Sequence, residues 1–323
     1  MVLSEKQGVS VYCTVLNEES SIKALLESLL SQTRLPDEIV IVDGGSTDRT
    51  IDVIHDYTQK YPIIRLFIEK NANVAQGRNM AIANTSYDII VSIDAGCIAD
   101  RFWLENIIEY FDSSVDIVAG VCVPDGKTLF EICSGEVLYP SVDEFKADWP
   151  SHQNLAFRKH VWTKIKYPEK CYRSEDSWFN LRLRENGFKC KLAKNSVVYW
   201  RPRKNFREVF NNSYMWAKSN IENDVRASKT RQLAQLGSRK LIWNSSSLLA
   251  FFVVFVFFSK VGAIILFPFI LKPMINTYPG EKNISKIIYK NTIYYTHILA
   301  YSLGYRDGQK IVKRRLKAES GKR

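Results

Sequence analysis

The pattern of apolar and polar positions changes period repeatedly along the first two thirds of the chain. Runs rich in β-branched residues at 9–15, 38–42 and 117–123 are typical of buried strands. Between them, apolar residues at 20–32 recur every three or four positions, as on one face of a helix. Strand and helix alternate, and parallel strands need such crossovers, so the pattern predicts an α/β fold with a mostly parallel sheet flanked by helices. Further strands are expected at 63–68, 88–93, 154–158, 190–193 and 197–200, and further helices at 52–60, 74–83, 102–111, 159–166, 176–186 and 205–223.

Three of the predicted strands end in polar residues. Asp43 follows one strand directly and precedes Gly44-Gly45, Asp94 follows another, and 16–19 (Leu-Asn-Glu-Glu) follows the first. Ligands in open α/β sheets bind just outside the carboxyl ends of the strands. We therefore expect a ligand site at this edge, with the glycines allowing a tight turn toward the ligand.

Two common nucleotide-binding signatures are missing from the chain. No Gly-x-Gly-x-x-Gly follows the first strand, and no Gly-x-x-x-x-Gly-Lys occurs, which argues against a dinucleotide-binding domain and a P-loop enzyme. The six cysteines form no Cys-x-x-Cys pair, so we expect free, buried thiols rather than disulfides or a structural zinc site.

The 323-residue chain changes composition after residue 240. Residues 241–271 contain a single charged side chain, Lys260, between apolar runs at 248–258 and 261–271, each shorter than the roughly 20 residues of a membrane span. Four alternatives remain: a tight membrane hairpin, one tilted span, an interfacial helix pair, and a buried soluble hairpin. Basic residues flank both ends, which favours both ends on the cytoplasmic side.

The formal net charge of +11 suggests an anionic partner. Basic residues cluster after Arg201 and in 310–323, where 313–317 would attract anionic lipid. Ile287, Ile288, Ile293 and Tyr294 are expected on an amphipathic helix at a membrane surface. The polar residues 1–8 do not resemble a signal peptide, so we expect a membrane-associated protein whose first domain faces the cytoplasm.

Six short motifs occur in order along the chain: 14–19 (Thr-Val-Leu-Asn-Glu-Glu), 41–48 (Ile-Val-Asp-Gly-Gly-Ser-Thr-Asp), 73–79 (Asn-Val-Ala-Gln-Gly-Arg-Asn), 93–96 (Ile-Asp-Ala-Gly), 154–158 (Asn-Leu-Ala-Phe-Arg) and 174–176 (Ser-Glu-Asp). Together they make the chain resemble the family 2 glycosyltransferases, which have the Rossmann-like GT-A fold. The resemblance covers about 9–203 and predicts a catalytic domain over 1–225. The change of composition predicts a helical C-terminal region over 226–323, with a membrane hairpin or interfacial helices at about 241–275 and a basic tail.

The resemblance implies transfer of a sugar, with inversion, from a nucleoside diphosphate donor, expected to be UDP-linked, to a lipid-linked saccharide or polysaccharide. It implies that Asp176, with Glu175, is the general base. Arg78, after a glycine at a helix start, suits the phosphates, although a surface role is the plain alternative. The implied donor-binding residues are Thr14, Asn17, Glu18, Asp43, Arg78, Asp94 and Gly96, and the implied acceptor or diphosphate residues are Trp149, Gln153, Asn154, Arg201 and Arg203.

The chain departs from the family pattern where a metal would bind. The family's second aspartate is Gly96 here, and 198–203 contains no histidine. Mg²⁺ or Mn²⁺ is the expectation from the resemblance, held through Asp94, but one carboxylate is a poor site for a hard cation. Alternatively Arg78, Arg201 and Arg203 neutralise the leaving diphosphate without a metal.

Three other functions are weighed against this one. A nucleotidyltransferase would need a glycine-rich phosphate loop after the first strand, which 16–19 does not provide. A catalytically inactive sugar-nucleotide-binding or scaffold subunit is favoured by Gly96 and disfavoured by the presence of Asp43, Asp94 and Asp176. A nucleic-acid-binding module has only the positive charge in its favour, and we expect no nucleic acid partner.

Overall fold

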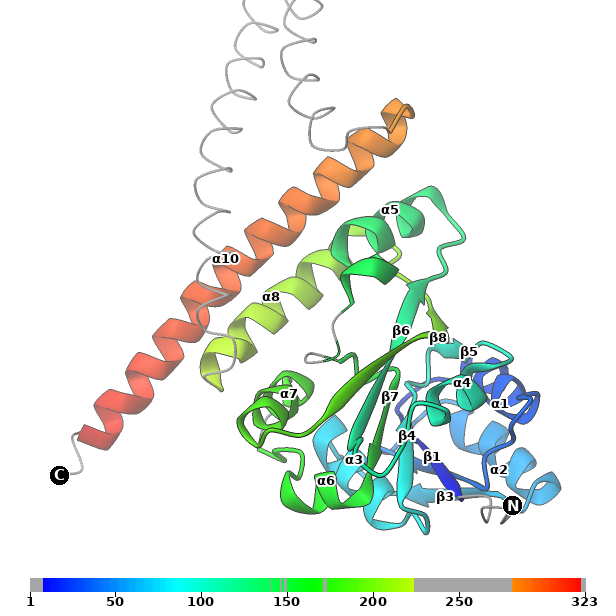
Figure 1. The fold of residues 1–323 in the computed structure, drawn as a ribbon. Coiled ribbons are helices and arrows are strands. Elements are labelled where there is room, and N and C mark those ends of the chain that lie inside the picture. The colour runs from blue at the N-terminus through cyan, green and yellow to red at the C-terminus, as the bar shows by residue number, and fades with distance from the viewer. Residues whose placement is uncertain are drawn as a thin grey trace, which may run out of the picture. The chain divides into compact units, whose positions relative to one another are not determined.

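The structure is a computed structural model that describes residues 8–139, 141–145, 147, 150–170, 173–223 and 281–320. It divides into two compact units (Figure 1). The first comprises 1–125 and 140–201, and the second comprises 126–139 and 202–323. Residues 126–139 and 202–223 thus join the C-terminal part of the chain, although the expected catalytic domain ran through 225.

The first unit is built on an eight-stranded sheet with the order β3-β2-β1-β4-β7-β6-β8-β5. Neighbouring strands pair in parallel from β3 to β4 and between β6 and β8, whereas β7 and β5 pair antiparallel to their neighbours. The strands are β1 (Val9–Val15), β2 (Glu38–Asp43), β3 (Ile64–Ile68), β4 (Ile89–Ser92), β5 (Cys97–Ala99), β6 (Ile117–Pro124), β7 (Leu155–Arg158) and β8 (Cys190–Trp200).

The expectation of a mostly parallel α/β sheet is confirmed, with two additions. The strand β5 was not predicted, because three residues carry no readable period. The two short strands predicted at 190–193 and 197–200 form one strand, β8, whose pairing with β6 shifts register between Ala119 and Val121. That irregularity interrupts the alternation of buried and exposed residues and so made one strand look like two.

Helices cover both faces of this sheet (Figure 1). On one face, Tyr12, Val40 and Phe157 pack with apolar residues of α3, α6 and α7 in a single buried cluster. The helices α1, α2 and α4 cover the other face. Their bounds are α1 (Ile22–Leu30), α2 (Thr50–Lys60), α3 (Val74–Ala83), α4 (Trp103–Ile108), α6 (Lys159–Lys164) and α7 (Glu175–Glu185).

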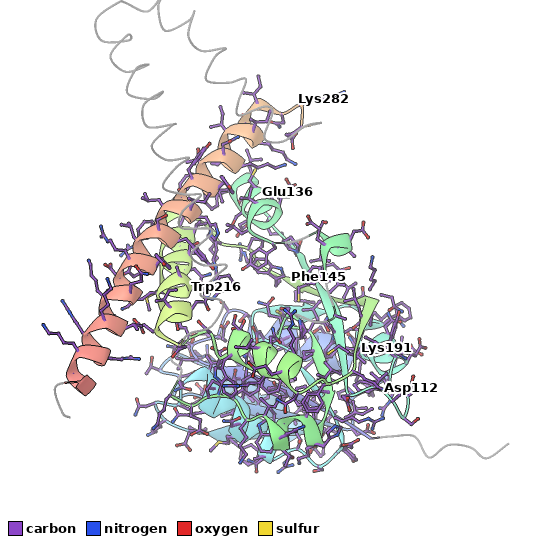
Figure 2. The ribbon with its side chains drawn as sticks, turned by 60° about the vertical axis from the view of Figure 1, so that its left-hand side comes forward. Asp112, Glu136, Phe145, Lys191, Trp216 and Lys282 are labelled. Atoms are coloured by element: carbon purple, nitrogen blue, oxygen red, sulfur yellow. The ribbon has the colours of Figure 1, made fainter. Side chains whose placement is uncertain are left out.

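The second unit is helical. It contains α5 (Leu129–Leu138), α8 (Phe206–Glu222) and the 37-residue α10 (Ile284–Ser320). Helix α10 lies against α8 at very short range, since a Cβ added at Gly304 would be 2.2 Å from the carbonyl oxygen of Tyr214. Glu136 of α5 faces the start of α10 (Figure 2), where it pairs with Lys290 at 2.6 Å.

Two sequence expectations change in this unit. No helix was predicted between 124 and 150, but this segment contains α5, which begins with a capping box between Thr128 and Glu131. The helix expected around Ile287 and Ile293 is present, but both side chains are buried within the unit, with 2% and 0% of their surface exposed, while Ile288 is 43% exposed. Only part of the expected membrane-facing stripe is therefore available to a lipid surface.

No helix in the described ranges is both long and apolar enough to cross a membrane. The apolar segment at 241–271 lies within 224–280, outside the described residues, and so does Trp149. The described cysteines, Cys13, Cys97, Cys122, Cys133 and Cys190, are free thiols as expected, and all except Cys190 are buried.

Candidate active site

The loops that follow β1 and β2 are tied together by hydrogen bonds. The Asn17 side chain accepts from the backbone N–H of Thr47 at 2.9 Å, and the backbone N–H of Asn17 donates to the Ser46 hydroxyl at 2.8 Å. Asn17 has φ of 56°, a left-handed conformation that asparagine tolerates better than most residues. The N–H of Glu18 donates to the Thr50 hydroxyl at 2.7 Å. These contacts give the expected donor loop one defined shape.

Asp43 is completely buried at the tip of β2. Its Oδ1 accepts from the backbone N–H groups of Gly45 and Ser46 at 2.7 and 2.8 Å, and its Oδ2 accepts from the Ser46 hydroxyl. Gly45 has φ of 99°, which a side chain would strain. The carboxylate therefore shapes the loop after β2, and its expected contact with a nucleotide base stays a prediction.

Arg78 joins three segments at the carboxyl edge of the sheet. It lies on α3, which begins with a capping box between Asn73 and Gln76. Its Nη1 donates to Oε1 of Glu175 at 2.9 Å, and its Nη2 lies 3.4 Å from Oδ1 of Asp94. The Arg78 side chain is 7% exposed and that of Asp94 is 39% exposed. The sequence-predicted residues Arg78, Asp94 and Glu175 are thus brought together in one cluster.

The electrostatics of this cluster are set by burial. Burial raises the pKa of Glu175, and the attraction of Arg78 opposes that rise without cancelling it. For Arg78, burial would lower the pKa, but Glu175, Tyr167 and Asp94 together raise it well above its usual value. The guanidinium is therefore a permanent, mostly buried cation beside one exposed carboxylate.

Asp176 follows Glu175 in the first turn of α7 and is partly exposed. Its Oδ1 accepts from the N–H of Ser177 at 2.6 Å. The residue before the helix, Ser174, has φ of 71° and a buried hydroxyl without a hydrogen-bond partner among the described residues. Such strain is often found next to functional residues, and here it fixes where α7 begins.

The acceptor-side residues are placed differently from one another. Asn154 is fully buried; its side chain accepts from the Trp103 indole at 2.8 Å and donates to Val121 and Ser196 carbonyls. It holds strands together and exposes no polar atom, which does not fit the expectation that it binds a sugar hydroxyl. Gln153 is partly exposed and Arg201 is exposed in the first unit, whereas Arg203 belongs to the second.

The residues present are a poor fit for a protein-built metal site. The described part of the chain contains no group of three or more His, Cys, Asp or Glu side chains that would hold a metal ion. Asp94 is the only carboxylate of its motif, and Arg78 lies beside it. A Cβ added at Gly96 would meet nothing within 4 Å, so the second carboxylate is missing although space for it exists.

Sequence reasoning missed the residues beneath Arg78. The ring of Tyr167 lies 5.3 Å from the Arg78 guanidinium carbon, and its hydroxyl contacts both Tyr12 and His152. Tyr167 lies just after α6, outside any predicted element, and Tyr12 looks like any strand aromatic, so no signal marked either. His152 directly precedes the predicted residue Gln153, but no role was predicted for it.

Comparison with known proteins finds similar sequences. Residues 10–163 match the family model described as glycosyl transferase family 2. O-antigen chain rhamnosyltransferase RfbN of Salmonella typhimurium is 26% identical over 217 residues, which cover 60% of this chain and 68% of that protein. Glycosyltransferase AglE of Haloferax volcanii is 24% identical over 225 residues, covering 66% and 73%.

Two solved structures share the fold. The mannosyltransferase PcManGT from Pyrobaculum calidifontis, in complex with GDP-Man and Mn²⁺, has a TM-score of 0.64 at 15% identity, covering 94% of this chain and 88% of that one. Residues 1–349 of S. aureus TarS have a TM-score of 0.50 at 18% identity, covering 95% and 92%. The chain is a glycosyltransferase with the GT-A fold, and it is similar to glycosyl transferase family 2 over residues 10–163.

Proposed function

We propose that the protein transfers a sugar, with inversion, from a nucleoside diphosphate donor to a lipid-linked saccharide or a growing polysaccharide. The observation that carries this proposal is the contact of Arg78 with both Asp94 and Glu175 at the carboxyl edge of the sheet. That edge is where an α/β sheet binds its ligand. The RfbN relative, an O-antigen chain rhamnosyltransferase, supports a glycan chain as the acceptor.

In this proposal Arg78 is the cation that faces the leaving diphosphate. A guanidinium has five N–H donors, and Glu175 and Asp94 contact only some of them. The remaining donors suit phosphate oxygens, and a fixed cation is most effective in a site of low dielectric constant. Because Glu175 is mostly buried and paired with Arg78, we propose that it anchors the arginine instead of acting as the base.

Asp176 is proposed as the general base. Inversion by a single displacement requires a carboxylate that removes the acceptor proton on the face opposite the leaving group. Asp176 is partly exposed, and it lies beside the anchor Glu175 in the first turn of α7. The partly exposed Gln153 is the remaining described candidate for contacts with the acceptor.

No step of this mechanism passes through a metal ion. The PcManGT structure is a complex with GDP-Man and Mn²⁺, but the described residues of this chain supply one carboxylate here, where a hard cation needs several oxygen ligands. Arg78, with Arg201 as a second candidate, is proposed to neutralise the charge on the departing diphosphate. We further propose that the basic C-terminal region associates with an anionic membrane surface, where a lipid-linked acceptor would be found.

A panel of nucleotide sugars tests the proposal. UDP-, GDP- and dTDP-linked sugars would each be added to the full-length protein while its unfolding is followed. A donor at 100 times its Kd stabilises a one-site protein by about 2.7 kcal/mol. We expect a UDP-sugar to raise the melting temperature of the wild type and to act more weakly on Asp94→Asn. Stabilisation by none of the donors would contradict the proposal.

A further inference from the structure

A chain of buried polar side chains runs beneath the candidate active site. The Tyr12 hydroxyl lies 3.3 Å from that of Tyr167, which lies 2.6 Å from Nδ1 of His152. Nε2 of His152 lies 3.0 Å from Oδ1 of Asn180. All four residues are buried, and His152 is only 3% exposed. Hydrogen-bonded groups buried in this way impose a specific arrangement on the residues around them.

The direction of the hydrogen bonds follows from the amide of Asn180. Its Nδ2 donates to the carbonyl of Pro150 at 2.9 Å, so its Oδ1 is left to accept from His152. Nε2 of His152 therefore carries a proton. Burial and the charge of Arg78 lower the pKa of His152 to about 4, so the ring is neutral and Nδ1 is an acceptor. The Tyr167 hydroxyl then donates to Nδ1 and accepts from Tyr12.

Tyr167 also contacts Arg78, Phe179 and Asn79. The ring centre lies 5.3 Å from the guanidinium carbon, and the ring also stacks on Phe179 of α7, with 4.4 Å between the ring centres and 17° between the ring planes. The backbone of Tyr167 is fixed by Asn79, which accepts from its N–H at 3.0 Å and donates to its carbonyl at 2.9 Å. Asn79 is the residue after Arg78 on α3.

Helix α7 connects the buried polar chain with Arg78. It supplies Asn180 and Phe179 to the buried chain, and Glu175 of its first turn accepts from Arg78. Any rotation of the Tyr167 ring would therefore disturb the surface beneath the guanidinium and the helix that holds its carboxylate partner. The charged groups that act on His152 are Arg78, which lowers its pKa, and Asp176, which raises it.

We propose that His152 and Tyr167 are positioning residues: the imidazole holds the tyrosine hydroxyl, and the tyrosine ring fixes the Arg78–Glu175 pair for catalysis. This inference rests on the proposed function, since it assigns a purpose to that pair. The bland alternative is a satisfied polar core, which would contribute stability and leave turnover unchanged. The positioning role and the structural role predict different turnover for a variant that alters the direction of the hydrogen bonds and keeps both rings.

Asn180→Asp alters that direction. A carboxylate against Nε2 would stabilise the imidazolium, so Nδ1 would become a donor and the Tyr167 hydroxyl would lose its acceptor. We expect a new ionisation in the kcat profile between about pH 5 and pH 8, matched by protonation of His152 in ¹⁵N spectra of the imidazole. Asn186→Asp, at the exposed C-terminal end of α7, is the matched control and should show neither.

Tyr167→Phe provides the second test and covers the case in which Asn180→Asp does not fold. It keeps the ring beside Arg78 and removes the hydroxyl, so we expect kcat to fall at least tenfold. Tyr61→Phe, at an exposed tyrosine, should change nothing. An unchanged kcat in Tyr167→Phe, or a protonated His152 in Asn180→Asp with a wild-type kcat profile, would overturn the positioning role.

The spectra separate this inference from the proposed function. If the wild type turns over no sugar nucleotide, the proposed function fails. The ¹⁵N spectrum of the wild type then still tests the hydrogen-bond chain, because we expect a neutral ring with the proton on Nε2. A proton on Nδ1 would contradict the chain whatever the activity.

Discussion

Nη1 of Arg78 lies 2.9 Å from Oε1 of Glu175, although 97 residues separate the two in sequence. The side chains are 7% and 12% exposed, so the pair is almost completely removed from water. Burying two charges costs more than their attraction returns unless the geometry is good, whereas losing one partner leaves an uncompensated charge. The pair is therefore better explained by function than by stability, which leads to the first prediction.

Replacing one member of this pair should be more damaging than replacing both. Arg78→Met leaves the Glu175 carboxylate buried and unpaired, and we expect a loss of about 3–5 kcal/mol in the free energy of unfolding. Arg78→Met combined with Glu175→Gln should recover most of that loss, since no charge remains buried. Activity should be absent from both variants. Urea denaturation measures the first quantity, and equal instability of the single and double variants would contradict the pairing.

Acid should destabilise the protein through His152. Its pKa is about 4 in the folded state against 6.5 for an ordinary histidine, so the unfolded chain binds more protons between these pH values. The contribution of His152 to the free energy of unfolding is therefore fully present above pH 6.5. About 3 kcal/mol of it is lost as the pH drops to 4. The pKa of His297 is also lowered in the folded state, whereas the pKa of Glu175 is raised.

The contribution of His152 is isolated by a difference measurement. The free energy of unfolding of the wild type and of His152→Gln would be measured by denaturant at several pH values between 4 and 7. We expect the gap between the two proteins to narrow as the pH falls, because only the wild type takes up the extra proton on unfolding. A gap that does not change with pH would show that His152 is not held neutral.

Gly96→Asp should create a divalent metal site. A Cβ at this position meets nothing within 4 Å, so the new side chain fits and would place a second carboxylate near Asp94. We expect calorimetric titration to detect Mn²⁺ binding to the variant in the presence of a nucleoside diphosphate. The wild type and Gly96→Asn, which has the same size without the charge, should bind far more weakly. Equal Mn²⁺ affinity in all three proteins would contradict the claim that the wild type binds the metal weakly because it lacks a second carboxylate.

Gly304→Ala should destabilise the helical unit. Alanine is normally favoured over glycine in a helix by about 1 kcal/mol, but here its Cβ would lie 2.2 Å from the Tyr214 carbonyl oxygen. Forcing the helices apart typically costs 1–3 kcal/mol. Thr292→Ala, at an exposed position of the same helix, is the control and should be neutral or slightly stabilising. Denaturation followed by circular dichroism compares them, and a stabilised Gly304→Ala would contradict the close packing of α8 and α10.

Much of the first unit was predictable because its signals are local. The bounds of β1 agree with the sequence prediction at both ends, and those of α3 do as well, since β1 is a continuous β-rich run and α3 begins at a capping box. The insertion of β7 between β4 and β6 was not predictable from the strand order. That arrangement depends on Asn154, whose side chain joins segments more than 30 residues apart.

The candidate site shows the same division. Short motifs identified Arg78, Asp94 and Glu175, because carboxylates and arginines at strand and helix ends follow readable patterns. The motifs did not reveal that Glu175 pairs with Arg78, or that the Asp43 carboxylate accepts hydrogen bonds from its own loop. Both contacts depend on which atoms face each other after folding. Tyr167 escaped because its role comes from a ring face and a hydroxyl contact, neither of which leaves a trace in sequence.

The most direct test of the account is the turnover of a donor by Asp176→Asn. The sugar nucleotide that stabilises the wild type would be used, with transfer or hydrolysis measured alongside donor affinity, and Glu185→Gln at the far end of α7 as control. Loss of a general base typically costs 10²–10⁴ in rate. The account predicts such a fall in kcat with donor affinity unchanged. Wild-type turnover by Asp176→Asn would contradict it.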